Sequence, residues 1–358
     1  MKVLTVVGGR PQFIKAAAVS DILRKNNEEF LVHTGQHFDH NMSQQFFDEL
    51  QLPKPDVNLG ISGGSHAKMT ARMMTAMEDV FVEQKPDWVL VYGDMNSTLA
   101  AALTAAKLHI PICHVEAGIR GRVMTNPEEI NRICTDHISS LRLTSTQIGL
   151  DNLIAENLAA NSYFVGNTMY DTFLKYKDRL TPSEIRLTLL DGGESTLPAR
   201  YYYLTCHREE NTNDDNNLLG ILNAMEQLEF PAIYPVHPRN KPRARRLNEQ
   251  HQFKNIMFVE PVGYLESLCL LNHAEKLVTD SGGLQAEAFF AKKKCVTILD
   301  FIVWPEVMID NRNTLSAPIA DEILQKLSLE QKIDPTYQPF GDGHAGTKIV
   351  ECLERGVS

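Results

Sequence analysis

The feature that most constrains the fold is an alternation of short, β-branched apolar runs with longer amphipathic stretches along the whole chain. Strands that alternate with helices build βαβ units, and such units place their strands in parallel sheets. The pattern therefore predicts an α/β fold with parallel sheets. The clearest apolar runs cover residues 2–7, 30–33, 88–92, 110–115, 201–205, 232–236, 256–259, 276–279 and 295–298.

The alternation stops once, between residues 171 and 198, where charges, Pro182, Gly192 and Gly193 interrupt the strand pattern. Such Pro- and Gly-containing stretches are typical of linkers. We therefore predict two Rossmann-like domains that face a cleft. The expected parts are an N-terminal domain at 1–170, a linker region at 171–198, a second domain at 199–342, and a C-terminal helix at 343–358 that packs back on the first domain.

The composition excludes several functional classes. The 358 residues are 43% hydrophobic, which allows a full core, and the formal net charge of −10 argues against general nucleic-acid binding. No apolar run approaches about 18 residues, so we expect neither a membrane span nor a signal peptide. The six cysteines form no CxxC pair and are expected to be buried, reduced thiols. We therefore expect a soluble, cytoplasmic protein.

The sequence offers no site for a dinucleotide cofactor or a metal. Residues 341–346 match GxGxxG by letter, but they follow no apolar run, so they do not predict a dinucleotide site. No Walker A or GxSxG sequence is present, and no His and Cys spacing fits zinc.

Three acidic residues stand where parallel α/β sheets carry their chemistry, beyond the carboxyl ends of strands. Asp94 follows one apolar run, and Glu116 follows the next, on a strand expected to be adjacent. Glu128 stands one residue inside a helix opened by Asn126 and Pro127. Helix capping is the alternative for Asp94 and Glu128, but their coincidence with Glu116 favours one site. Crowded carboxylates raise one another's pKa, which prepares a proton donor beside a base.

Cationic and imidazole side chains flank other predicted strand ends. Arg10 and Lys15 border the first strand–helix turn, where a phosphate can bind at the helix N-terminus. An ordinary surface pair is the alternative interpretation. In the second half, His207 and Arg208 follow one apolar run and His237 follows the next. Two histidines at strand ends favour proton transfer or phosphate contact over a purely structural role.

A phosphate-binding turn is predicted at Ser281, Gly282 and Gly283, between an apolar run and a helix. Their small side chains let backbone N–H groups approach a phosphate, and the helix dipole favours its charge. Glu287 on the following helix has a carboxylate that can accept from a ribose diol. Tyr264 is a candidate to border a nucleobase.

Together these residues resemble the non-hydrolysing UDP-N-acetylglucosamine 2-epimerase family over nearly the whole chain. The resemblance implies the GT-B fold, in which two Rossmann-like domains hold a nucleotide sugar in a cleft. It also implies a homodimer that uses neither NAD nor a metal. The motifs that carry the resemblance are Gly9-Arg10-Pro11 with Lys15, Thr34-Gly35-Gln36-His37, Gly93-Asp94, Val115-Glu116-Ala117-Gly118 with Arg120, Pro127-Glu128-Glu129-Ile130-Asn131-Arg132, His207-Arg208 with Glu210-Asn211, Val236-His237-Pro238, and Asp280-Ser281-Gly282-Gly283 with Gln285 and Glu287.

The resemblance further implies a two-step interconversion of UDP-GlcNAc and UDP-ManNAc that supplies surface-polysaccharide precursors. A base takes the C2 proton while UDP leaves C1, the glycal stays bound, and UDP adds back as a proton reaches C2 from the other face. Opposite faces require at least two acid–base groups. By resemblance, Asp94, Glu116, Glu128 and His207 are catalytic. The residues expected to bind the substrate or its UDP are Arg10, Lys15, Arg120, Arg208, His237, Tyr264, Ser281, Gly282, Gly283 and Glu287.

One stretch departs from the family pattern and leaves the substrate open. Leu299, Ile302 and Val303 stand where many members carry arginine, threonine and glutamate. The spacing from Glu116 to Glu128 resembles a branch that includes epimerases of UDP-2,3-diacetamido-glucuronate, which is one alternative substrate. A nucleotide-sugar-binding protein without catalysis is a second alternative, and a glycosyltransferase of the same fold is a third.

Overall fold

The computed structural model describes residues 1–36 and 40–356, and for residues 40–44 it describes the backbone alone. His37, which belongs to one of the family motifs, therefore lies outside the described residues. The chain divides into two compact units. Unit 1 contains Met1–Leu174 and Gln338–Ser358, and unit 2 contains Lys175–Tyr337.

Unit 1 is built on a seven-stranded parallel sheet with the strand order β3-β2-β1-β4-β5-β6-β7. Its inner strands are apolar along their whole length because helices cover both faces of such a sheet. The strands are β1 (Lys2–Val7), β2 (Glu28–His33), β3 (Val57–Asn58), β4 (Trp88–Tyr92), β5 (Ile112–Ala117), β6 (Leu141–Thr144) and β7 (Ser162–Phe164).

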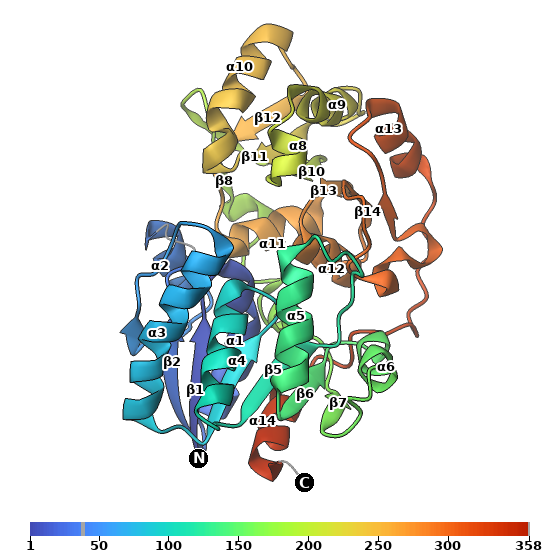
Figure 1. Cartoon of the computed structure of the whole chain (residues 1–358). Coiled ribbons are helices and arrows are strands. Elements are labelled where there is room, and N and C mark those ends of the chain that lie inside the picture. Colours follow the sequence, from blue (N-terminus) through green and yellow to red (C-terminus); the bar gives the residue numbers. More distant parts are fainter. Residues whose placement is uncertain (37–39, 357–358) are drawn as a thin grey trace. The chain divides into compact units, whose positions relative to one another are not determined.

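The strand order determines which face of the sheet each helix of unit 1 covers. Right-handed crossovers place helices on opposite faces when the chain runs in opposite directions across a sheet. The first two helices therefore cover one face and the next four the other, and Figure 1 shows α3, α4 and α5 side by side. The helices are α1 (Arg10–Leu23), α2 (His40–Glu49), α3 (His66–Gln84), α4 (Asn96–Lys107), α5 (Pro127–Ile138), α6 (Gln147–Ala155), α7 (Thr168–Tyr176), which ends in unit 2, and α14 (Ala345–Arg355).

The C-terminal helix α14 packs on α1 within unit 1. A Cβ atom added at Gly346 would lie only 2.0 Å from the carbonyl oxygen of Ala18, so the two backbones approach each other closely. Ile349 and Leu353 of α14 are fully buried. The chain therefore leaves unit 1 once and returns to complete its core.

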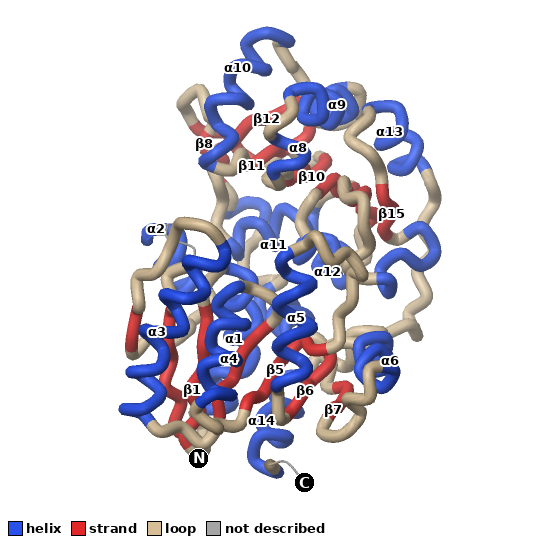
Figure 2. The backbone as a smooth tube through the Cα atoms, in the orientation of Figure 1, coloured by secondary structure: helices blue, strands red, loops and turns tan. Residues whose placement is uncertain are grey.

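Unit 2 contains a six-stranded parallel sheet with the order β12-β11-β10-β13-β14-β15. Its strands alternate with helices along the chain, and Figure 2 distinguishes the two kinds of element by colour. The strands are β10 (Tyr202–Thr205), β11 (Ala232–Pro235), β12 (Ile256–Val259), β13 (Lys276–Thr279), β14 (Lys294–Thr297) and β15 (Asn313–Leu315). The helices are α8 (Glu209–Thr212), α9 (Asp215–Glu226), α10 (Lys241–His251), α11 (Tyr264–His273), α12 (Gly282–Phe290) and α13 (Ala320–Ser328), with 3-10 turns η1 (Pro182–Glu184), η2 (Pro238–Asn240) and η3 (Pro305–Asn311).

Each unit buries its own apolar core. In unit 1, the core joins Leu4, Val89 and Val91 of the sheet to the alanines of α4, whose small side chains let that helix lie close to the strands. In unit 2, the core is centred on strand residues such as Leu204 and Val278.

Three details differ from the sequence expectations or add to them. The stretch expected as a linker carries an antiparallel pair, β8 (Arg186–Thr188) and β9 (Glu194–Thr196), joined by Gly192 and Gly193 with φ of +93° and +90°. Cys134 is exposed, whereas all six cysteines were expected to be buried. Among the described residues, no helix is both long and apolar enough to cross a membrane.

Candidate functional site

The candidate acids of unit 1 lie at one edge of the sheet. Strands β4 and β5 are parallel neighbours, with Tyr92 opposite Val115, so their carboxyl ends lie together. Asp94 follows β4 after the turn at Gly93, and Glu116 is the last residue but one of β5. The expected adjacency of the two strands is confirmed.

Glu116 adopts an unusual backbone conformation. Its φ is +71°, in the left-handed region that glutamate rarely occupies, and the pairing of β5 with β6 shifts register around it. Such strain is retained where the surroundings fix a residue, and it concentrates at functional sites. The bulge re-aims the side chain, which is only 6% exposed.

Lys15 on α1 donates to Oε1 of Glu116, so a buried cation is paired with this carboxylate. The other oxygen, Oε2, is buried without a hydrogen-bond partner among the described residues. A Cβ added at Gly93 would lie 2.9 Å from the Lys15 Nζ atom and 3.3 Å from Glu116 Oε1. A side chain at position 93 would therefore make the Lys15 ammonium group shift. Lys15 was expected to meet a phosphate, but the structure places its ammonium group against Glu116.

Asp94 is paired with a second cation, because Arg132 on α5 donates to its Oδ2 atom. Burial alone would raise the pKa of Asp94, but the positive charges of Arg132 and Lys15 outweigh burial and hold it below the ordinary value. Asn131 donates to the Asp94 backbone carbonyl at 2.9 Å. Asp94 is therefore a fixed carboxylate at neutral pH and does not cap α4, whose N-cap is Met95.

Helix α5 begins as the sequence predicts. Pro127 is its first residue, and the Asn126 side chain accepts the N–H of Glu128 at 3.0 Å. The carboxylate of Glu128 is half-buried. Its neighbour Glu129 is buried and accepts from the backbone N–H groups of Gly121 and Arg122, which closes the preceding loop onto the helix.

Arg120 was expected to bind substrate, and the structure places it in a structural role. Its side chain is 5% exposed, and it donates to Asp136 at 2.7 Å and to both oxygens of Glu156 at 2.7 Å. Burial opposes its charge, but these two carboxylates outweigh burial and raise its pKa. The guanidinium group is therefore held by other side chains of unit 1, and its part in substrate binding stays a prediction.

Arg10 opens α1 and remains a candidate ligand residue. It follows Gly9, the helix N-cap, which has no side chain to satisfy the first backbone N–H groups. Its guanidinium carbon lies 4.5 Å from the centroid of the Phe46 ring. An aromatic face beneath a guanidinium group orients it at this helix N-terminus.

In unit 2, the buried Asp280 organises the end of β10. Its carboxylate accepts the backbone N–H groups of His207 (2.9 Å) and Arg208 (2.8 Å), and His207 Nδ1 lies 3.1 Å from Oδ1. Arg208 Nε donates to the Asp280 carbonyl at 2.9 Å. The two predicted residues are thus held side by side at the strand tip.

His237 lies next to this pair. Its ring centroid is 6.2 Å from that of His207, with the planes inclined by 28°. Arg239 donates to the His207 carbonyl at 2.6 Å, which ties the ends of β10 and β11 together. Two imidazoles and two guanidinium groups therefore gather at one edge of this sheet, an arrangement suited to an anion.

The predicted phosphate turn forms the start of α12. Ser281 is the N-cap, and its hydroxyl accepts the N–H of Leu284 at 3.3 Å. A Cβ added at Gly282 would meet no atom within 4 Å, so the space beside this helix N-terminus is open. Gly283 follows within the first turn. An open helix N-terminus is a favourable place for a phosphate.

Glu287 lies one turn further along α12, buried, and accepts a hydrogen bond from the Tyr264 hydroxyl at 2.9 Å. Tyr264 itself is buried at the start of α11. The structure thus makes Tyr264 a partner that orients the expected ribose-binding carboxylate.

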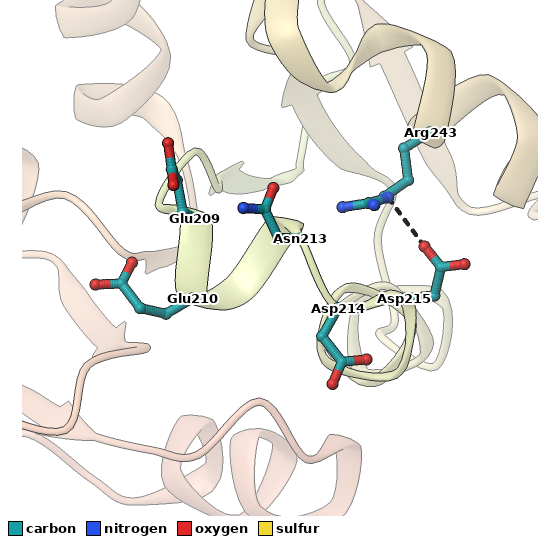
Figure 3. A pocket seen from close by; sticks show the side chains of 6 residues that line it. All are labelled: Glu209, Glu210, Asn213, Asp214, Asp215 and Arg243. Carbon is teal, nitrogen blue, oxygen red and sulfur yellow. Dashed lines mark ion pairs between the residues drawn. The ribbon is translucent and has the colours of Figure 1, made fainter. Parts of the chain in front are cut away.

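An open hollow in unit 2 lies beside α8 and the start of α9 (Figure 3). Its one cation, Arg243, already pairs with Asp215 at 2.9 Å. The remaining carboxylates would repel a diphosphate, so this hollow does not qualify as the phosphate site. Its lining residues are Glu209, Glu210, Asn213, Asp214, Asp215 and Arg243.

Sequence reasoning assigned no role to four residues that build these sites: Arg132 and Asp280, which it quoted within motifs, and His114 and Asp136. Arg132 lies three positions after Glu129, on the same face of α5, and this spacing is a readable signal for an ion pair. Asp280 stands between an apolar run and the small residues of the phosphate turn, so the sequence predicts its place at a strand end. Nothing in the sequence pattern pairs His114 with Asp136.

Comparison with known proteins identifies the family. A model of the UDP-N-acetylglucosamine 2-epimerase family matches residues 21–354. The chain belongs to this family. The resemblance drawn from the motifs is therefore confirmed, and the protein is an isomerase with the α/β architecture of the GT-B fold.

Relatives match over the full length of the chain. A UDP-2,3-diacetamido-2,3-dideoxy-D-glucuronate 2-epimerase from Pseudomonas aeruginosa is 43% identical, with 99% of this chain and 100% of the relative covered. A UDP-N-acetylglucosamine 2-epimerase homolog from Methanococcus maripaludis is 42% identical, with 99% of each chain covered. The crystal structure of the Methanocaldococcus jannaschii UDP-GlcNAc 2-epimerase in complex with UDP-GlcNAc and UDP is 36% identical, with a TM-score of 0.88 over 99% of this chain and 100% of that chain.

Proposed function

We propose that this protein interconverts UDP-GlcNAc and UDP-ManNAc by eliminating UDP and adding it back. One observation carries the proposal: two carboxylates, Asp94 and Glu116, stand at the tips of adjacent strands, each paired with a buried cation. Removing and returning a proton on opposite faces of C2 requires two such groups.

The forward half-reaction breaks the C2–H and C1–O bonds. One carboxylate takes the C2 proton, the electron pair forms the C1=C2 double bond of a glycal, and UDP leaves with the C1 oxygen. Glu116 suits this role because its Oε2 atom has no hydrogen-bond partner among the described residues. In the return step UDP adds to C1, Glu116 releases the first proton to water, and a second carboxyl group, Asp94 or Glu128, delivers to C2 from the other face a proton that it has taken up from water.

We assign UDP binding to unit 2. His207 and Arg208 are held at a strand tip by Asp280, and the N-terminus of α12 is open at Gly282. Charged donors of this kind stabilise the negative charge that develops on a departing diphosphate. Glu287, held by the Tyr264 hydroxyl, would accept from the ribose hydroxyl groups.

A second substrate is favoured by one stretch of unit 2. The Arg208 guanidinium carbon lies 5.3 Å from the centroid of the Phe301 ring, so the 299–303 loop borders the proposed phosphate residues. In this loop Leu299, Ile302 and Val303 are apolar, and Ile302 is 42% exposed. An apolar surface suits the methyl group of an additional acetamido substituent. The 43% identical relative named for a diacetamido sugar supports the same alternative.

The test is incubation in D2O with each of the two UDP-sugars, followed by 1H NMR. We expect loss of the C2 proton signal of UDP-GlcNAc and appearance of UDP-ManNAc deuterated at C2. Faster C2 exchange of UDP-2,3-diacetamido-glucuronate would show that this sugar, and not UDP-GlcNAc, is the preferred substrate. Absence of exchange with both sugars at high enzyme concentration would contradict the proposal.

We extend the proposal to a homodimer, the assembly that the family resemblance implies. Sedimentation equilibrium of the full chain at micromolar concentration is the measurement. A mass of about 40.3 kDa over the whole concentration range would contradict it.

A further inference from the structure

Asp136 of α5 is a buried carboxylate with three donors. It is 0% exposed and accepts from His114 Nδ1 at 2.7 Å, from the Gly118 backbone N–H at 3.0 Å, and from Arg120 at 2.7 Å. His114 stands two residues before Glu116, and Gly118 two residues after it. One carboxylate therefore holds the His114 ring on β5 and the backbone just after β5, on either side of the strained residue.

The second ring nitrogen of His114 reaches the neighbouring strand. Nε2 lies 2.7 Å from the backbone carbonyl oxygen of Gly93, the residue before Asp94. His114 is also 0% exposed. The imidazole thus bridges the ends of β4 and β5 from inside the sheet.

These contacts define the charge of His114. A carbonyl oxygen only accepts, so Nε2 must carry a hydrogen. Burial raises the pKa of Asp136, but the neighbouring positive charges, including its ion pair with Arg120, outweigh burial and lower it, so Asp136 is ionised and Nδ1 must carry a hydrogen as well. A ring protonated on both nitrogens is an imidazolium cation.

We propose that His114 and Asp136 are positioning residues of the epimerase: a buried imidazolium–carboxylate pair that fixes the spacing of Asp94 and Glu116 and adds positive charge beside Asp94. This inference rests on the proposed function, because the two positioned acids are its proton-transfer groups. Neither residue touches the reacting atoms. Each acts through the backbone of a strand tip.

Charged side chains from several elements surround the His114–Asp136 pair. Asp94 faces Arg132 of α5 and Lys15 of α1 in addition to His114, and Lys15 is shared with Glu116. Asp136 also interacts with Arg142 of β6, which donates to its backbone carbonyl. His114 contributes to holding the Asp94 pKa low, after burial and the two stronger cations.

The charge state is tested by NMR on the full chain labelled with 15N and 13C at histidine. We expect the His114 ring to carry hydrogens on both nitrogens at pH 7 to 8, with the resonance assigned by its absence in His114→Gln. If that variant does not fold, coupling across the hydrogen bond to the Gly93 carbonyl identifies the ring in the wild type. A neutral His114 ring at pH 7 would overturn the proposal, whether or not the protein shows epimerase activity.

The catalytic consequence is tested with His114→Gln, whose amide can still donate to the Gly93 carbonyl but carries no charge. We expect the acidic limb of the kcat profile to move to higher pH by roughly 1 unit, with KM little changed. The matched control is Glu29→Gln, which removes another buried carboxylate of unit 1, bonded to Thr5, Ser20 and Arg24.

The control variant should lose stability and keep the wild-type pH profile. A wild-type profile and kcat in His114→Gln would overturn the positioning role. If the wild type itself fails to exchange C2, the proposed function fails, while the NMR measurement still decides the charge of the pair.

Discussion

At the scale of single residues, the site depends on how buried charges are paired. Glu116 and Lys15 form one pair, and Asp94 and Arg132 form the other. Glutamate holds a φ of +71° at position 116, where glycine would be less strained, which indicates that the carboxylate is required there.

Replacing Glu116 by glutamine should abolish most proton transfer. We expect C2 deuterium exchange to fall by about 10²–10⁴-fold, the usual contribution of a positioned acid–base group. UDP affinity, measured by calorimetry, should stay near the wild-type value because Glu116 is not among the expected UDP ligands, most of which lie in unit 2. Near wild-type exchange in Glu116→Gln would refute the assignment. Glu29→Gln is the matched control, since it makes the same change at a buried carboxylate outside the site.

The lowered pKa of Asp94 predicts the direction in which the unfolding free energy changes with pH. Because the folded-state pKa lies below the unfolded value of about 3.9, the pair with Arg132 stabilises the protein above that pH. This contribution is lost as the pH falls through the folded-state pKa. Wild type should therefore exceed Asp94→Asn in unfolding free energy at pH 7, and urea titrations should show the difference shrinking below about pH 4. A difference that grows on acidification would contradict the account.

Residue roles divide into those that sequence can predict and those that it cannot. Asp94 and Glu116 follow apolar runs, so their place at strand tips was predictable. Arg120 stands in a family motif but is committed to Asp136 and Glu156. Its partners lie 16 and 36 positions away, and no local pattern reports such pairings.

At the scale of elements, α5 brings most of the unit 1 site together. Its residues Glu129, Arg132 and Asp136 follow each other at intervals of three and four, so they lie along one face. That face contacts the Asp94 turn, the preceding loop and β5 through hydrogen bonds. The helix start at Asn126 and Pro127 was predicted from capping signals, but its buried face was not.

Short strands escaped prediction for a physical reason. The two residues of β3 and the three residues of β15 are too few for a periodic pattern, and their pairing depends on neighbours far along the chain. The buried strands β1, β4, β12 and β13 were placed at their observed bounds because their runs of four to six residues are each followed within two residues by Gly, Asp or Pro.

The docking of α14 on α1 gives a prediction for an element. Gly346→Ala would drive a Cβ to within 2.0 Å of the Ala18 carbonyl, so the helices must separate. We expect a loss of about 1–3 kcal/mol in unfolding free energy, measured by urea denaturation. Glu351→Ala, at an exposed position of the same helix, should change it by less than about 0.5 kcal/mol. Equal effects of the two substitutions would contradict close helix docking.

At the scale of the whole molecule, the residues with different proposed roles lie in different units. The carboxylates proposed for proton transfer, Asp94, Glu116 and Glu128, lie in unit 1, and most of the residues proposed to bind phosphate and ribose lie in unit 2. The family motifs predict this division from the sequence, because they fall in both halves of the chain. The boundary could not be placed exactly by composition, because α7 runs through it and the stretch after it forms β8 and β9.

This division predicts how UDP should stabilise variants. A ligand at about 100 times its Kd adds about 2.7 kcal/mol to the unfolding free energy. We expect Glu116→Gln to keep the UDP-induced rise in Tm and Arg208→Gln to lose most of it, as measured by thermal shift. Equal loss in both variants would show that unit 1 also holds the UDP group.

The central claim is that UDP leaves C1 and returns, and positional isotope exchange tests it most directly. UDP-GlcNAc carrying 18O in the oxygen between C1 and the β-phosphate is incubated with the enzyme and then recovered. Cleavage of the C1–O bond lets the phosphate rotate, so we predict that the label appears in non-bridging β-phosphate positions of the recovered UDP-sugars. Epimerisation at C2 with all of the label still in the bridge would contradict the account.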